Sequence, residues 1–410
     1  MTPKAALAAL ALAASTANGQ APPSPGGTLP PVTVRGNYDN GVGTSDAASQ
    51  GVVTATLLQN RPTLRPAEVL EFVPGVIVTQ HSGDGKANQY FVRGFNLDHG
   101  TDFATWVDGM PANMVSHAHG QGYADLNWLL PELVERIDYR KGPYYAEEGD
   151  FSSAGAAHVR LVGTLPGRLA SITLGQRGYA RALLAGSAAL SSGHLLYALE
   201  SAHNDGPWRN PEKFHRTNGV LRYSLADGAT RWSVTGMAYT AGWNSTDQVP
   251  RRAVDAGLVD RFGAIDPTDG GQTARHSLSG AWQHRVQGGE WNASAYVVRS
   301  RLNLFSDFTY FLDDRAGDQF EQTERRTLTG GAISRRWATP VADRDGSTTF
   351  GVQVRRDHLA PVGLYGTARR SRTATIQESQ VRQASWALYA RNETEWTRWL
   401  RSVIGVRADH

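Results

Sequence analysis

The sequence contains no cysteine among its 410 residues. This absence excludes disulfides, zinc sites built on thiolates and cysteine nucleophiles. Charge of one sign is not in excess either, with 41 Lys and Arg against 38 Asp and Glu, so no basic stripe indicates a nucleic-acid partner. Long apolar runs are also missing, because no segment approaches the roughly 18 consecutive apolar residues of a membrane-spanning helix. The chain is instead rich in glycine, which is typical of turns, with 44 residues. It also has 11 tryptophans and 14 tyrosines, residues that are enriched where a protein crosses the surface of a membrane.

Signatures of catalysis are missing as well. The sequence has no Gly-x-Ser-x-Gly elbow, phosphate-binding loop, dinucleotide fingerprint or His-Glu-x-x-His helix. The adjacent Glu147 and Glu148 would point to opposite faces of a strand, so we interpret them as surface charge rather than a catalytic pair. We therefore expect neither an enzyme nor a bound cofactor.

The first residues have the pattern of an export signal. Lys4 precedes an apolar run from Ala5 to Ala14, and small residues follow around Ala17 to Gly19. A charged start, a short apolar stretch and a small-residue cleavage zone are typical of a secretory signal peptide. We assign residues 1–19 to this peptide and expect an exported protein.

From about Leu169 onward, apolar and polar residues alternate in long segments separated by Gly, Asp, Asn and Ser. In "TTFGVQVRRD", Phe350 and Val354 share one face, whereas Arg355 and Asp357 share the other. Strands with one apolar face and one charged face suit a β-barrel with lipid outside and water inside. A soluble β-sandwich or propeller would alternate too and stays open on the pattern alone.

Residues 20–63 form a Pro-, Gly-, Ser- and Asp-rich tail with one β-prone island, "LPPVTVRG", at 29–36. Such an island can add as a strand to the sheet edge of a partner. An ordinary linker would have the same composition, so both interpretations remain.

A more compact unit runs from about Leu64 to Gly163. Pro66 predicts the start of a short helix that ends at Pro74-Gly75, and "VIVTQ" begins a strand. Extended runs follow, with breaks at Gly94, Asp108-Gly109 and Gly142-Pro143.

Four elements of this unit, "LEFVPGVIV", "YFVRGF", "WVDGMPAN" and "ELVERIDYRKGPYYAEEG", resemble in order and spacing the plug domain of TonB-dependent outer-membrane receptors. The resemblance implies an α+β plug inside a transmembrane barrel of about 22 antiparallel strands. It divides the chain into the signal peptide, the tail at 20–63, the plug at 64–165 and part of the barrel at 166–410. We count about half of the expected strands and therefore expect the sequence to be the N-terminal part of a longer protein.

The resemblance also implies a function: active uptake of a scarce solute across the outer membrane of a Gram-negative bacterium. The expected solute is a ferric siderophore or another metal chelate. Alternatives are a receptor for free zinc, copper or nickel, a passive porin-like protein and a signalling receptor. The implied partners are outer-membrane lipid, the solute, and TonB with its inner-membrane energising complex. TonB would contact a box formed by Pro31, Val32, Thr33, Val34 and Arg35.

In relatives, cations of the plug form ion pairs with the barrel. The resemblance assigns this role to Arg93 and to a cation before Gly142-Pro143. The sequence has "RKGP" where Arg-Gly-Pro is usual, so either Arg140 or Lys141 could fill the second position.

Histidines gather in the part of the plug that faces the solute in relatives. Four of the 12 in the chain lie between positions 81 and 119. The predicted solute-binding residues are His81, His99, Asp102, His117 and His119. Because neutral imidazoles bind transition metals, His117 and His119 of "SHAHGQG", with His99 or His81 as a third partner, form a candidate metal site. They could also donate hydrogen bonds to an organic solute or be plain polar loop residues.

Overall fold

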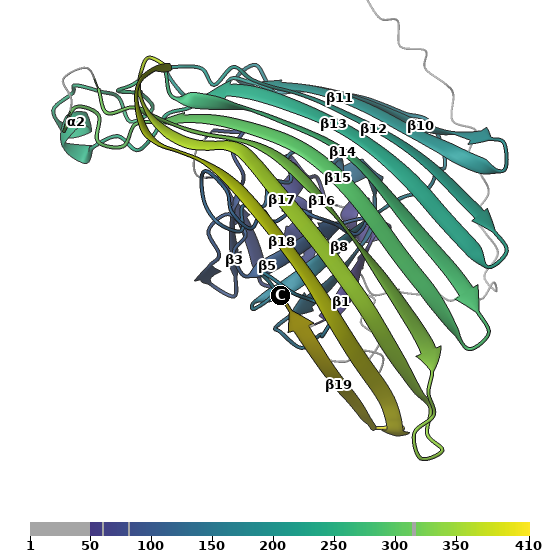
Figure 1. Cartoon of the computed structure of the whole chain (residues 1–410). Helices are drawn as coiled ribbons and strands as arrows, with labels where there is room; N and C mark the ends of the chain where they lie inside the picture. The colour runs from purple at the N-terminus through teal and green to yellow at the C-terminus, as the bar shows by residue number, and fades with distance from the viewer. Residues whose placement is uncertain (1–49, 60, 81–82, 314–316) are drawn as a thin grey trace, which may run out of the picture. The chain divides into compact units, whose positions relative to one another are not determined.

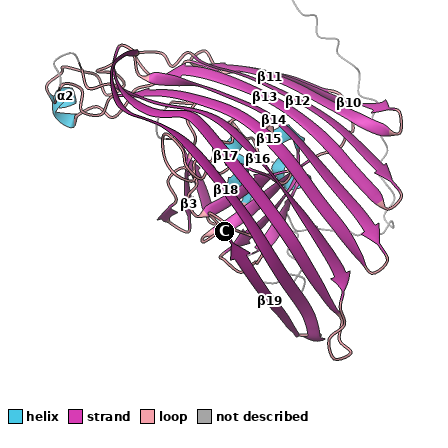
Figure 2. Ribbon diagram, viewed as in Figure 1, coloured by secondary structure: helices cyan, strands magenta, loops and turns pink. Residues whose placement is uncertain are grey.

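The computed structural model describes residues 50–59, 61–80, 83–313 and 317–410. The predicted signal peptide, the predicted box at 31–35 and His81 lie outside the described residues. Strands dominate the regular structure, with few and short helices (Figure 2). Over the described ranges, no helix has the length and apolar character needed to cross a membrane.

The N-terminal unit contains two small sheets. The first is five-stranded, with spatial order β1-β7-β8-β5-β6, and the second is three-stranded, with order β2-β3-β4. All its pairs are antiparallel except β5 with β8. Their bounds are β1 (Gln50–Thr54), β2 (Val76–Thr79), β3 (Gln89–Val92), β4 (Phe95–Asn96), β5 (Phe103–Val107), β6 (Met110–Pro111), β7 (Val134–Lys141) and β8 (Gly155–Leu161). The helical segments are α1 (Ala55–Gln59), η1 (Pro66–Phe72) and η2 (Pro131–Leu133).

These elements follow the predicted breaks. The helix begins at Pro66, as expected, although it is a 3-10 helix rather than an α-helix. The turn between β5 and β6 has Asp108 at φ 49° and Gly109 at φ 79°, which is the left-handed conformation that Asp-Gly turns favour. Strand β1 lies before the predicted plug boundary at 64 and pairs with β7. Small and polar residues, mainly Ala, Ser and Thr, surround this strand of only five residues, so the sequence pattern did not reveal it.

The remaining strands form one antiparallel sheet in chain order. It has eleven strands, as the alternation predicted, and each pairs with its neighbour in sequence. The strands are β9 (Leu169–Leu174), β10 (Ala180–Leu190), β11 (Gly193–Asn204), β12 (Phe214–Asp227), β13 (Thr230–Asn244), β14 (Gly270–Val286), β15 (Gly289–Ser306), β16 (Phe320–Ala338), β17 (Gly346–Ala368), β18 (Ser371–Thr397) and β19 (Leu400–Asp409). The sheet is curved and the small sheets lie on its concave side (Figure 1).

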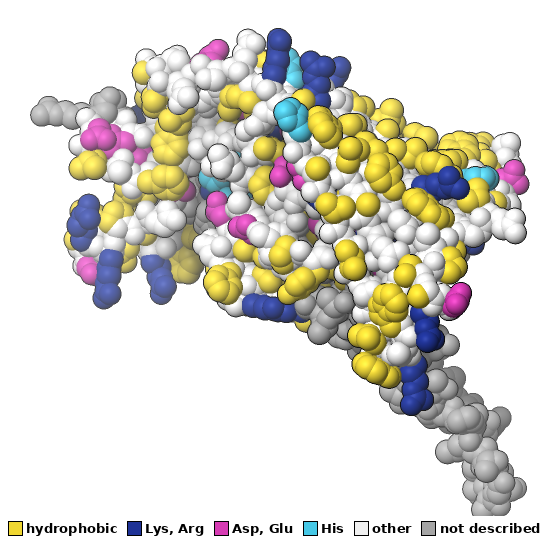
Figure 3. Space-filling view, turned by 60° about the horizontal axis from the view of Figure 1, so that its bottom comes forward, with side chains coloured by type: hydrophobic (Ala, Val, Ile, Leu, Met, Phe, Trp, Pro, Cys, Tyr) yellow, Lys and Arg dark blue, Asp and Glu magenta, His cyan; other side chains and the backbone are white. Residues whose placement is uncertain are grey.

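The two faces of the large sheet differ in polarity. Leu199, Leu221 and Val354 expose half or more of their surface on the convex face. Glu200 and Asn218, in contrast, are fully buried on the face toward the small sheets. Figure 3 shows hydrophobic side chains spread over one face of the molecule. This arrangement, with apolar residues outside and polar residues inside, is the one expected of a membrane barrel that contains a polar domain.

The connections at the two ends of the large sheet also differ. Two-residue turns at 228–229 and 287–288 join strands at one end. At the other end, residues 245–269 join β13 to β14 and include α2 (Arg251–Asp255), and residues 307–319 join β15 to β16. The connection between β17 and β18 at this end has only residues 369–370, so the longest connections, but not every connection, lie here. In outer-membrane barrels the end with the longest loops is extracellular. We refer to these as the short-turn end and the long-loop end.

Candidate functional site: a histidine cluster held between plug and sheet

The segment that contains "SHAHGQG" is a closed loop. Met114 and Tyr123 pair across its base, with the Met114 amide donating to the Tyr123 carbonyl at 3.0 Å. The Asn113 side chain, which is almost fully buried, accepts from the Thr105 amide at 2.7 Å and donates to the carbonyl oxygens of Gly100, Phe103 and Gly122. One amide group thus fixes the loop to two preceding segments of the chain.

Three predicted site residues meet around the ring of Tyr123. The His117 ring stacks on it with centroids 3.9 Å apart, and the rings of His99 and His119 lie 5.5 and 5.9 Å away. The hydroxyl of Tyr123 accepts a hydrogen bond from the Ala87 amide at 3.0 Å. We call His99, His117, His119 and Tyr123 the histidine cluster.

Strand β16 of the large sheet holds the loop from the other side. Glu324 accepts from the Ala118 amide at 3.0 Å, and the Gln322 Nε2 donates to the Ala118 carbonyl at 2.9 Å. Arg326 donates to the carbonyl of Ser116. Because Gln322 and Glu324 lie near the start of β16, just after the 307–319 connection, the histidine cluster is nearer to the long-loop end.

Glu324 and Arg326, which form hydrogen bonds with the loop backbone, also belong to a buried network of ion pairs. Arg326 pairs with Glu324 at 3.0 Å and with Asp357 of β17, and Arg355 pairs with Asp357 at 2.6 Å. The side chains of Glu324, Arg326 and Asp357 are almost fully buried. Arg355 also donates to the Asn113 carbonyl at 3.0 Å. We call Glu324, Arg326, Arg355 and Asp357 the β16–β17 clamp.

Burial keeps the loop imidazoles neutral. Desolvation lowers the pKa of His117 to about 4, although Glu324 opposes the shift. Desolvation, with the charge of Lys86, lowers the pKa of His119 to about 3. Neutral rings present lone pairs to a metal ion or act as both donor and acceptor toward a solute.

Each ring nitrogen of His117 has a polar neighbour: Nδ1 accepts a hydrogen bond, and Nε2 lies near a carboxylate. The His119 amide donates to His117 Nδ1 at 3.2 Å, so the proton of the neutral ring is on Nε2, which lies 3.7 Å from a Glu324 carboxylate oxygen. His99 and His119 differ, because their Nε2 atoms face each other at 3.1 Å. Over the described residues, no group of three or more His, Cys, Asp or Glu side chains is arranged to hold a metal ion.

Asp102 is not part of the histidine cluster. Its carboxylate accepts from the Ser153 hydroxyl, and its carbonyl accepts from the Ala154 amide at 2.8 Å. Asp102 thereby ties the segment before β5 to the segment before β8, and its solute-binding role stays a prediction.

The predicted plug cations make contacts within the plug. Arg93 is exposed in the turn between β3 and β4, and its amide donates to the Gly75 carbonyl at 2.8 Å. The Lys141 ammonium donates to the Pro74 carbonyl at 3.0 Å. Arg140 pairs with Glu147 at 2.7 Å and with Glu148 at 3.1 Å. For these three cations, the described part of the chain shows no ion pair with the large sheet.

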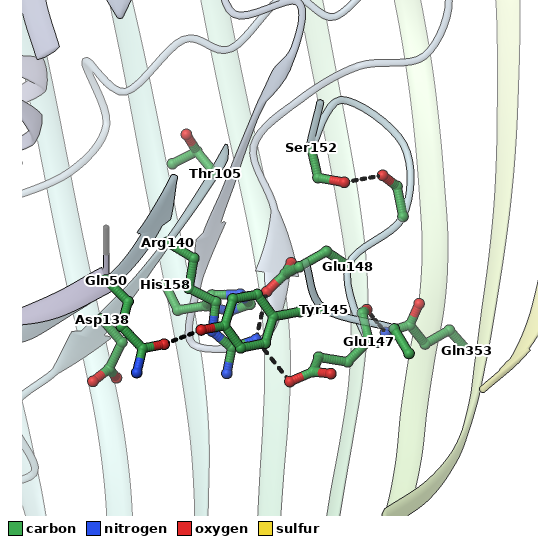
Figure 4. Close-up of polar contacts among 12 residues, drawn as sticks. Gln50, Thr105, Asp138, Arg140, Tyr145, Glu147, Glu148, Ser152, His158 and Gln353 are labelled. Atoms are coloured by element: carbon green, nitrogen blue, oxygen red, sulfur yellow. Dashed lines mark hydrogen bonds and ion pairs between the residues drawn. The ribbon is translucent and has the colours of Figure 1, made fainter. Parts of the chain in front are cut away.

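Arg140 is instead the centre of a second polar cluster (Figure 4). Glu148 also accepts from His158 at 2.8 Å and is buried, which corrects its interpretation as surface charge. Its burial would raise the carboxyl pKa, but His158 and Arg140 more than offset this and leave that pKa below its ordinary value. Glu147 reaches the large sheet, where it pairs with Arg391 of β18 at 2.8 Å.

Among the described residues, the pairs of Arg with Asp or Glu between the plug and the large sheet have the opposite polarity to the predicted one. In each of three pairs the plug supplies the carboxylate and the sheet supplies the arginine. They are Glu132 with Arg181, Asp108 with Arg222, and Glu147 with Arg391. The sequence contained no signal for this, because which acid meets which base depends on how the two parts pack. For the same reason sequence reasoning missed Gln322, the β16–β17 clamp and Asn113.

Comparison with known proteins agrees with this architecture. Residues 43–156 match the family model of the TonB-dependent Receptor Plug Domain. Among solved structures, the ferric citrate transporter FecA in its unliganded form aligns with a TM-score of 0.71 and 15% identity, over 88% of this chain and 56% of that one. The copper transporter OprC aligns with a TM-score of 0.66 and 16% identity, over 89% and 55%. The siderophore receptor PirA from Acinetobacter baumannii aligns with a TM-score of 0.64 and 15% identity, over 88% and 56%.

The chain therefore spans slightly more than half the length of these structures. The identities are low, so the likeness concerns the fold. The matched proteins are receptors and transporters, not enzymes. Residues 43–156 are thus a TonB-dependent receptor plug domain, and with the eleven-stranded sheet around it the chain has the fold of the TonB-dependent receptors.

Proposed function

We propose that the protein is an outer-membrane transporter of a Gram-negative bacterium that takes up a small solute, a metal chelate such as a ferric siderophore, with energy supplied through TonB. The observation that carries the proposal is the histidine cluster on a plug loop nearer to the long-loop end of the sheet, where a solute from outside would arrive. The names of the structural neighbours support the class of solute, because they include a ferric citrate transporter, a copper transporter and a siderophore receptor.

The contacts of the plug support a transporter rather than an open pore. The plug is joined to the sheet at two levels: by the β16–β17 clamp nearer the long-loop end and by Glu147 with Arg391 nearer the short-turn end. Near the second level, Gln50 at the start of β1 accepts a hydrogen bond from the Tyr145 hydroxyl. Strand β1 follows the predicted box at 31–35 in sequence and lies within the range 20–63 assigned to the tail, so force applied at the box would reach this end of the plug first.

Residues 31–35 would receive that force by adding as a strand to TonB. A photo-crosslinking amino acid placed at Thr33 of the full-length protein should capture TonB in living cells. Val32→Pro should abolish the crosslink, because proline removes a backbone donor that strand addition requires. Val32→Ile keeps the β-prone backbone and should crosslink like the parent. Equal crosslinking by the proline and isoleucine variants would contradict the box assignment.

A further inference from the structure

We propose that His99 and His119 bind a transition-metal ion directly through their facing Nε2 atoms, and that the ion arrives with at least two adjacent coordination positions open. The inference rests on the proposed function and names the class of solute: an incompletely chelated metal ion rather than a coordinatively saturated siderophore complex.

The first argument is the number of protons. Three short contacts run in a chain: His99 Nδ1 to the Asn88 carbonyl at 3.0 Å, the two Nε2 atoms at 3.1 Å, and His119 Nδ1 to Gln322 Oε1 at 2.8 Å. Both outer contacts end on oxygens that only accept, so each needs the proton of its ring. Two neutral imidazoles carry two protons between them. When both rings are neutral, the two Nε2 atoms therefore face each other with their lone pairs.

The orientation of Gln322 is fixed, so it does not resolve this conflict. Its Nε2 donates to the Ala118 carbonyl at 2.9 Å. Exchanging the amide oxygen and nitrogen would satisfy His119 Nδ1 but would set two acceptors against each other at Ala118.

The second argument is the distance itself. Two imidazole nitrogens bound to one ion at about 2.0 to 2.1 Å and separated by 3.1 Å subtend an angle of about 100° at the metal. This angle lies between those of tetrahedral and square or octahedral coordination, so one ion can accept both lone pairs. An ion between the rings would also remove the repulsion of the facing lone pairs.

The third argument is the outer contacts of the two rings. A metal-binding histidine usually donates its other N–H to a carbonyl or carboxylate, which fixes the tautomer and the ring orientation. The Asn88 carbonyl and the Gln322 amide oxygen occupy these positions for His99 and His119. His117 lacks such an arrangement, because its Nδ1 accepts from the His119 amide and its Nε2 faces Glu324.

The surroundings indicate what completes the coordination. The Asp98 carboxylate lies 3.8 Å from His99 Nε2 and its side chain is 59% exposed, so it can approach an ion from the open side. Lys86 is buried nearby and opposes a bare dication. With two imidazoles as the fixed ligands, the remaining positions belong to Asp98, water or an anionic chelator brought by the metal.

Titration of the purified full-length protein with Cu²⁺ tests this inference. Electron paramagnetic resonance should show coordination by two imidazole nitrogens, and calorimetry should give the affinity. Loss of a group that only orients a metal-binding histidine costs about 10- to 100-fold in metal affinity, so loss of the histidine itself in His119→Gln should weaken binding by at least about tenfold. His215→Gln is the control, because it removes an exposed histidine of β12 outside the histidine cluster and should leave the copper signal and affinity unchanged.

The inference is overturned if wild type and His119→Gln bind Cu²⁺ equally, or if His215→Gln removes the nitrogen signal while His119→Gln keeps it. His119 is the preferred test position because it is only partly buried, whereas replacing the buried His99 could disturb folding. The readout needs no transport. Absence of copper binding alongside energised uptake would remove the metal site and leave the proposed function standing. Copper binding without energised uptake would support the metal site and contradict the proposed function.

Discussion

Replacing Arg326 with alanine should lower the free energy of unfolding of the full-length protein by about 3 to 5 kcal/mol, the usual cost of breaking a buried ion pair. The guanidinium is fully buried and pairs with Glu324 and Asp357. Without it, two carboxylates remain close together away from water, and the Ser116 carbonyl loses its donor. We expect the unfolding midpoint in urea, measured in detergent micelles, to fall accordingly.

Arg325→Ala is the matched control, because Arg325 is the neighbouring arginine on β16 and is exposed. Its unfolding free energy should stay within about 0.5 kcal/mol of the wild type, as for most surface substitutions. Arg326→Lys keeps the charge but not the planar fork and should be intermediate. A wild-type midpoint for Arg326→Ala would show that the β16–β17 clamp does not stabilise the protein.

The second large effect is loss of stability in mild acid. The pKa values of His117 and His119 are lowered to about 4 and about 3, against 6.5 for an ordinary histidine. Below about pH 6.5 the unfolded chain therefore binds protons that the folded protein excludes. Stability is complete above that pH and falls as the pH drops toward 4, with a slope of up to about 1.4 kcal/mol per pH unit for each histidine.

The test compares unfolding at pH 7 and pH 5 for the wild type and the double variant His117→Gln/His119→Gln. The wild type should lose at least about 1 kcal/mol more than the variant over this interval. The buried carboxyl of Asp125, with a pKa raised to about 6, titrates in the same range but is present in both proteins. Identical pH dependence of the two proteins would mean that the imidazoles are not buried in neutral form.

The sequence predicted the fold well because the signals are local. Alternation marks the eleven strands of the large sheet, and Pro66, Asp108-Gly109 and Gly142 mark where elements begin and end. It also located the histidine cluster, since three of the four predicted histidines meet around Tyr123. It did not separate His117 from His119, because their different roles depend on β16, some 200 residues later in the chain.

The sequence also did not reveal that the plug supplies the acid, and the sheet the arginine, in the ion pairs between them. Arg140, next to the Gly-Pro turn, matches the position of a cation that pairs with the barrel in relatives. Here Glu147 and Glu148 follow it closely and take up its charge within the plug. Glu147 then carries the contact to Arg391. In this chain the acids that follow Arg140, and not Arg140 itself, thus make the ion pair with the sheet.

The measurement that tests the account most directly is metal accumulation by cells that express the full-length protein under transition-metal limitation, followed by elemental mass spectrometry. Cells with the wild type should accumulate at least one of iron, zinc, copper or nickel above cells without the protein. A protonophore should abolish the excess, and so should His119→Gln with the protein still in the outer membrane. Excess metal that survives both treatments, or no excess of any of the four metals, would contradict energised uptake through the histidine cluster.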